Sequence, residues 1–208
     1  MALTTGCADG YAAQTEAFLN CLRERLDPMA NPRAFPDLIA TLSYTNDDNG
    51  HHLERVRQRW LREGDLERTA IAFELDYVYP GRSRAEIFAN VMGAAERFPQ
   101  FRDRAEAVLA SWDDHEAQYP SSKPDPEFRV LSWDPAPPMS LVEATEFIAD
   151  HPAPNAPPKF LAEIIDELLP CLTVEAQAEI HAVCDAWAGG SDEWRAAIAA
   201  SMEVPGLG

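Results

Sequence analysis

The most polar segment of the chain runs Asn46-Asp47-Asp48-Asn49-Gly50-His51-His52. Imidazole and carboxylate groups together suit zinc or iron. A calcium loop is excluded, because placing Gly50 at the glycine of that template puts Val56 where a bidentate Glu is required. We favour a turn that caps the following helix and keep a metal site as the alternative. The candidate ligands of that alternative are Asp47, Asp48, His51 and His52.

The usual catalytic templates are missing from the rest of the sequence. We find no GxGxxG, GxxxxGK[ST], HExxH or GxSxG pattern. A Cys–His nucleophile pair stays open, since four Cys and five His occur and such partners need only meet in space. We therefore expect no cofactor and name no catalytic residue, and a non-catalytic role is favoured over an enzyme.

Residues 127–133 are rich in β-branched and aromatic side chains and could form a single strand. A lone strand cannot satisfy its own backbone groups, and pairing with another molecule would satisfy them. The more ordinary interpretation is an extended segment that lies across the helical core, and we favour it. If the segment binds a partner, the contacting residues are Glu127, Phe128, Arg129, Val130, Leu131 and Trp133.

Charge is the strongest feature of the composition. The 208 residues contain 35 Asp and Glu against 17 Lys and Arg, a net charge of −18. Nucleic acids and anionic lipids would repel such a chain, whereas a basic protein would attract it. Residues 1–120 contribute −7 and residues 121–208 contribute −11. We therefore predict a protein partner that is basic or that presents an extended segment. We predict no binding to nucleic acid or to a membrane.

The elements that carry these residues have helical periodicity. Leu53, Val56, Trp60 and Leu61 share one helix face, and Ser–Glu pairs three residues apart at 83/86 and 140/143 predict capping boxes. Ten of the 17 prolines fall between 120 and 158, where proline favours irregular chain. We predict a mainly α fold, a multi-helix bundle or irregular helical hairpins, with a Pro-rich extended segment and at most one or two short strands.

The same change of composition predicts the domain organisation. Residues 1–119 are expected to form an N-terminal helical domain and residues 120–158 a Pro-rich extended segment with one short helix. Residues 159–208 are expected to form an acidic helical part packed on the first domain. The four cysteines form no CxxC pair, and no apolar run approaches the ~18 residues of a membrane helix, so we expect a cytoplasmic protein. Abundant Arg, Ala and Pro suggest a bacterial source.

Two functional hypotheses follow from these observations. The first is a non-catalytic acidic binding protein, either immunity- or antitoxin-like and neutralising a basic protein, or an accessory subunit of a heteromeric enzyme that presents, for example, a peptide substrate. The alternative is a helical metal- or small-molecule-dependent enzyme that uses the Asp47/Asp48/His51/His52 cluster. A DNA mimic ranks lowest, because the acids of residues 143–193 are interspersed with core residues on separate helices.

Overall fold

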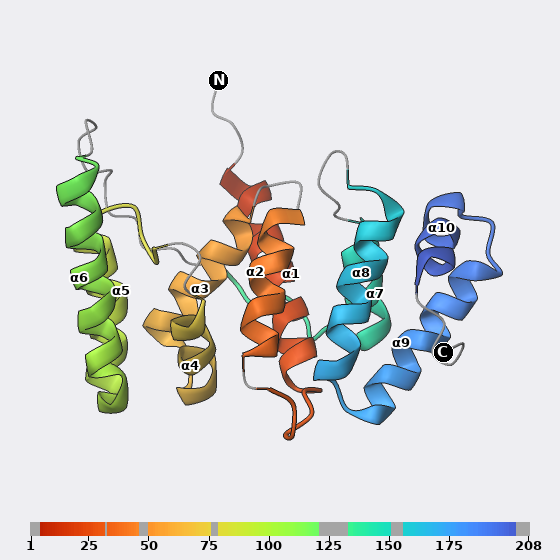
Figure 1. Ribbon diagram of the computed structural model, residues 1–208, viewed down its shortest axis with the longest axis horizontal. Coiled ribbons are helices and arrows are strands. Elements are labelled where there is room, and N and C mark those ends of the chain that lie inside the picture. The colour runs from red at the N-terminus through yellow and green to blue at the C-terminus, as the bar shows by residue number, and fades with distance from the viewer. Residues whose placement is uncertain are drawn as a thin grey trace. The chain divides into compact units, whose positions relative to one another are not determined.

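The computed structural model describes residues 5–31, 33–45, 50–75, 79–120, 133–150 and 156–202. These residues form ten α-helices, two short 3-10 helices and no strand (Figure 1). The prediction of a mainly α, multi-helix fold is therefore confirmed. No helix in the described ranges is long and apolar enough to cross a membrane.

The chain divides into two compact units. Unit 1 is discontinuous and comprises residues 1–51 and 134–208, whereas unit 2 is the continuous stretch 52–133. The sequence boundaries expected at 119 and 158 differ from these positions. Composition marks the proline-rich stretch, but it carries no signal that the two ends of the chain belong to the same unit.

Unit 1 consists of helices that pack in two rows. Helix α1 contacts α7, and α7 contacts α9, while α2 contacts α8 and α8 contacts α10 (Figure 1). The first and second helices of successive pairs thus form separate layers, the arrangement of stacked helical hairpins. The bounds are α1 Thr5–Arg23, α2 Ala34–Thr45, α7 Leu141–Asp150, α8 Pro158–Leu168, α9 Val174–Ala188 and α10 Glu193–Ser201.

Apolar side chains at helical spacing explain why these helices form and which faces they bury. Leu161, Ile164 and Ile165 of α8 are each 1 % exposed, so the apolar stripe of this helix is its buried face. Phe18 of α1 stacks on Phe147 of α7, with ring centroids 5.1 Å apart. These contacts bring the first helix of the chain against the segment that follows unit 2.

Backbone pairing ties the two parts of unit 1 together. Leu26 and Leu172 form an isolated antiparallel bridge. The amide of Asp27 donates to the Cys171 carbonyl, and the amide of Thr173 donates to the Arg25 carbonyl, each at 2.9 Å. This backbone pairing thus joins the segment that follows α1 to the segment that precedes α9. Residues 127–132, which belong to the segment that could form a strand, lie outside the described residues.

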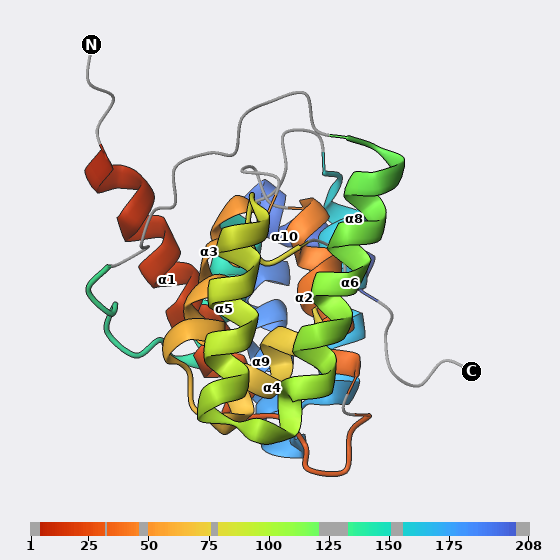
Figure 2. The same cartoon turned by 90° about the vertical axis from the view of Figure 1, so that its left-hand side faces the viewer.

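Unit 2 contains α3 His51–Glu63, α4 Leu66–Glu74, α5 Arg84–Arg97 and α6 Arg102–Gln118. Figure 2 shows α5 and α6 side by side. The predicted stripe of α3 is buried, with Trp60 1 % and Leu61 0 % exposed. Arg97 of α5 donates to the Leu61 carbonyl at 2.9 Å, and Arg104 of α6 pairs with Glu74 of α4. Side chains of α5 and α6 therefore anchor the ends of α3 and α4.

Local capping follows the sequence closely. Glu86 and Glu143 donate backbone amides to the Ser83 and Ser140 hydroxyls, each at 3.2 Å, as the capping boxes require. The cap of α10 is Asp192, whose carboxylate accepts from two backbone amides of the first turn.

Candidate functional site

The proposed metal cluster is only partly described. His51 is exposed and His52 is half-buried at the start of α3, and Asp47 and Asp48 lie outside the described residues. Gly50 has a φ of 79°, a left-handed conformation that glycine adopts readily. Within the described part of the chain, no three His, Cys, Asp or Glu side chains are grouped so that they could hold a metal ion. The metal site stays a prediction.

Of the candidate partner-binding segment, only Trp133 is described. Its ring is 8 % exposed and lies beneath the guanidinium groups of Arg55 and Arg59, at 5.5 Å and 4.8 Å from the ring centroid. Arg59 also donates to the Trp133 carbonyl at 3.2 Å. Trp133 thus packs within unit 2 against α3. The remaining candidates, Glu127, Phe128, Arg129, Val130 and Leu131, lie outside the described residues.

The three cysteines whose side chains the structure describes make poor nucleophiles. Cys21, Cys171 and Cys184 are free and buried. Burial, followed by the charges of the neighbouring Asp185 and Asp166, raises the pKa of the Cys184 thiol to about 11. Burial also raises the pKa of the other two thiols. Because the thiolate is the reactive form, these side chains are suited to packing and not to catalysis.

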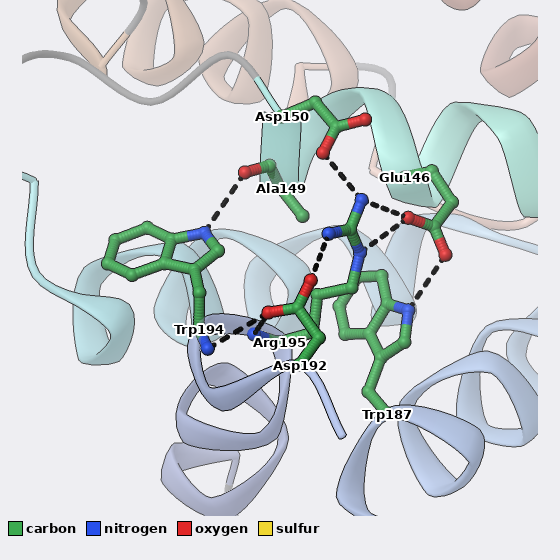
Figure 3. A network of polar contacts seen from close by, with 7 residues as sticks. All are labelled: Glu146, Ala149, Asp150, Trp187, Asp192, Trp194 and Arg195. Carbon is green, nitrogen blue, oxygen red and sulfur yellow. Dashed lines mark hydrogen bonds and ion pairs between the residues drawn. The ribbon is translucent and has the colours of Figure 1, made fainter. Parts of the chain in front are cut away.

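The most extensive polar contact that the sequence did not reveal is centred on Arg195 of α10 (Figure 3). Its guanidinium contacts Glu146 at 2.6 Å, Asp150 at 2.5 Å and Asp192 at 2.6 Å. Glu146 and Asp150 belong to α7, and Asp192 caps α10. The indole of Trp187 in α9 donates to Glu146 at 2.9 Å. The contacts around Arg195 and Glu146 therefore join α7, α9 and α10 of unit 1.

The hydrogen bonds of this network also shift the pKa of one of its carboxyl groups. The amide and guanidinium of Arg195 both donate to Asp192, and they lower the pKa of that carboxyl below its ordinary value of 3.8. The indole of Trp194 donates to the Ala149 carbonyl at 3.1 Å, which fixes α10 against the end of α7 (Figure 3). A lone arginine in an acidic stretch was the only sequence signal for this arrangement.

Charge is strongly segregated between the two units. Unit 1 contains 20 acidic and 5 basic residues, a net charge of −15, whereas unit 2 contains 15 acidic and 12 basic residues, a net charge of −3. Each of the 5 cations of unit 1 has a contact inside the unit. Arg23, Arg33, Lys159 and Arg195 contact carboxylates, and Arg25 donates to a backbone carbonyl. These contacts leave the surface of unit 1 with an excess of carboxylates.

Helix α9 presents part of this excess on one exposed face. We call this the outer face of α9, and it consists of the acids Glu175, Glu179 and Asp185 and the small residues Ala178, Ala182 and Ala186, all exposed. The opposite side packs on α7 and α10. Among the described residues, no hydrogen bond or ion pair is seen for these three carboxylates. Short alanine side chains between them leave the helix open to close approach by another molecule.

Comparison with known proteins identifies no relative: no protein-family model, no curated protein and no solved structure matches the chain significantly.

Proposed function

We propose that this chain is a non-catalytic binding protein whose acidic unit 1 docks onto a basic partner protein. The observation that carries the proposal is the charge of −15 in a unit whose few cations are engaged internally. A concentrated negative surface attracts a cationic protein over several ångströms and accelerates encounter. The stacked hairpins of unit 1 support the proposal, because such stacks present extended surfaces.

Two biological settings fit this activity. In the first, the chain is immunity- or antitoxin-like and covers a cationic toxin in the bacterial cytoplasm. In the second, it is an accessory subunit that completes an enzyme or presents a peptide substrate within a biosynthetic complex. Both settings require a basic protein surface and no nucleic acid or membrane, because polyanionic partners would be repelled.

The proposal is tested by affinity purification of the tagged chain from its native host, with quantitative mass spectrometry. The test variant carries Glu175→Gln, Glu179→Gln and Asp185→Asn on the outer face of α9. The matched control carries Glu96→Gln, Asp103→Asn and Asp114→Asn, which remove three exposed carboxylates from unit 2. We expect wild type and control to recover a stoichiometric basic protein, and the test variant to recover roughly tenfold less.

Two results would count against the proposal. Recovery of no stoichiometric partner, together with monomeric elution in lysate, would remove it. Equal loss of partner from the test and control variants would show that location of the charge on unit 1 is unimportant. Elemental analysis of the same purified protein checks the metal-dependent form of the enzyme alternative, in which the Asp47/Asp48/His51/His52 cluster binds the metal.

A further inference from the structure

Unit 2 contains a cavity of about 280 Å³. A cavity of about 150 Å³ is large enough to hold one benzene molecule, so the larger volume suits a molecule of two fused rings. Residues of α3, α4 and α6 and of the segment before α5 line the cavity, and all of them belong to unit 2. The described lining consists of Arg57, Phe73, Tyr79, Pro80, Arg104, Ala107, Val108 and Ser111.

The two arginines of this lining are already engaged by the protein itself. Arg57 is 3 % exposed, and its Nε donates to the Ala72 carbonyl at 2.9 Å. Arg104 pairs with the carboxylate of Glu74 and donates to the Phe73 carbonyl at 3.3 Å. An anion beside Arg104 would also meet the negative charge of Glu74. A neutral ligand avoids both this repulsion and the cost of removing a charge from water.

The two hydroxyl groups of the lining also have partners. The Tyr79 hydroxyl donates to the Ser111 carbonyl and lies 3.0 Å from both this oxygen and the Ser111 hydroxyl. A ligand is therefore not required to complete the hydrogen bonds of these groups. The remaining surface is provided by apolar side chains and by the Tyr79 ring. The lining thus favours a ligand that is held mainly by apolar contacts.

Contacts outside the cavity hold its apolar wall in place. The side-chain amide of Asn90 donates to the Pro80 carbonyl at 2.7 Å, and Phe73 stacks on Phe101 with ring centroids 5.1 Å apart. Asn90 and Phe101 are not part of the lining. A wall fixed in this way cannot easily close over the void, whose lining atoms lack contacts on one side. A ligand restores those contacts at a small cost in entropy, because the site is already formed.

We propose that this cavity binds a neutral, mainly apolar molecule of two fused rings. The rings pack against Phe73, Pro80 and Val108, and the exposed Ala107 lies at the entrance. The proposal goes beyond partner docking by unit 1 and does not depend on it, because every described residue of the lining belongs to unit 2.

The test is an NMR titration of the full chain with indole, a neutral compound of two fused rings. We expect saturable shifts with a Kd of about 1 mM. The methyl signals of Val108, in the lining, should move more than those of Val91, which is buried in α5 outside it. Pyrrole keeps the N–H group of indole but lacks the second ring, and we expect it to bind roughly tenfold more weakly. Indole-3-carboxylate adds a negative charge and should bind no more tightly than indole.

Two variants locate the binding within unit 2. Ala107→Phe fills the entrance of the cavity from an exposed position and weakens indole binding by roughly tenfold. Ala110→Phe adds the same ring at an exposed position of α6 outside the lining and leaves binding unchanged. The comparison of Val108 with Val91 uses the wild-type chain, so it does not depend on the folding of either variant.

Four results would overturn the proposal. They are the absence of saturable indole shifts at Val108, equal binding of pyrrole and indole, severalfold tighter binding of indole-3-carboxylate, and equal binding by the Ala107→Phe and Ala110→Phe variants. None of these results affects recovery of a basic protein through unit 1.

Discussion

Arg195 is the side chain on which the polar structure of unit 1 depends most. Its guanidinium is shared by three carboxylates from α7 and from the α10 cap. Without it, Glu146, Asp150 and Asp192 would repel one another across a part-buried space. A single exposed ion pair rarely contributes measurably, but a network around a part-buried arginine does.

The first prediction concerns replacement of this arginine. Arg195→Gln is expected to lower the free energy of unfolding by roughly 1–2 kcal/mol. Urea denaturation followed by circular dichroism measures this. Lys159→Gln is the matched control, because it removes one exposed pair, Lys159–Glu163; its stability should equal that of wild type. Equal stability of both variants would contradict the structural role of the network.

The same variant changes the titration of Asp192. In wild type the pKa of this carboxyl is below 3.8, chiefly because the Arg195 amide donates to it and then because the guanidinium does. A lowered pKa means that the carboxylate stabilises the fold above about pH 4 and that this contribution is lost as the pH falls further. In Arg195→Gln we expect the pKa to rise toward 3.8 but to stay below it, since the amide remains. Carboxyl-carbon NMR measures the shift, and an unchanged value would contradict the contact.

The buried thiols give a second, independent prediction. With a pKa of about 11, Cys184 is almost entirely protonated at neutral pH. Iodoacetamide should therefore modify Cys21, Cys171 and Cys184 slowly in the native protein and rapidly in urea. Peptide mass spectrometry over a time course distinguishes the sites. Rapid native labelling of Cys184 would show that it is neither buried nor inert.

Residue-scale prediction from sequence succeeded where the interaction is local. The Ser83 and Ser140 caps contact residues three positions away, so the Ser–Glu spacing in the sequence was enough to predict them. Arg195 reaches Glu146, 49 residues distant, and Arg59 reaches Trp133, 74 residues distant. Nothing in local spacing selects such partners.

At the scale of elements, two glycines differ in whether their surroundings leave room for a side chain. A Cβ on Gly64, between α3 and α4, would lie 2.4 Å from the Trp60 carbonyl oxygen, which is backbone and cannot move aside easily. Gly93, within α5, has nothing within 4 Å of the same position. The first site therefore excludes a side chain and the second accepts one.

We expect opposite effects from two identical substitutions. Gly64→Ala should destabilise the protein by roughly 1–3 kcal/mol, because the end of α3 must shift. Gly93→Ala should stabilise it by about 0.5–1 kcal/mol, because alanine is the better helix former. Thermal unfolding of both variants measures the difference. Destabilisation by both substitutions, or by neither, would contradict the described geometry.

Helix positions were predictable, but their grouping was not. Apolar periodicity placed the buried face of α3, because one helix face must leave water wherever it packs. The pairing of α1 with α7 and of α2 with α8 joins segments on either side of unit 2. This grouping depends on tertiary contacts of high sequence separation, which single-chain patterns do not encode.

At the scale of the whole molecule, charge segregation is the central feature. Sequence counting assigned the larger share of the charge to residues 121–208, whereas grouping by unit assigns −15 to unit 1 and −3 to unit 2. The acids of the N-terminal 51 residues join those of the C-terminal part. The docking surface is therefore expected on unit 1 and not on the nearly neutral unit 2.

The most direct test is the salt dependence of association between the purified chain and its co-purified partner. Stopped-flow fluorescence measures the association rate constant between about 50 mM and about 500 mM salt, where the screening length falls from ~14 Å to ~4 Å. We predict at least a tenfold decrease for wild type, and a shallower decrease for the Glu175→Gln/Glu179→Gln/Asp185→Asn variant than for the unit 2 control. A rate constant independent of salt would contradict docking through the acidic surface of unit 1.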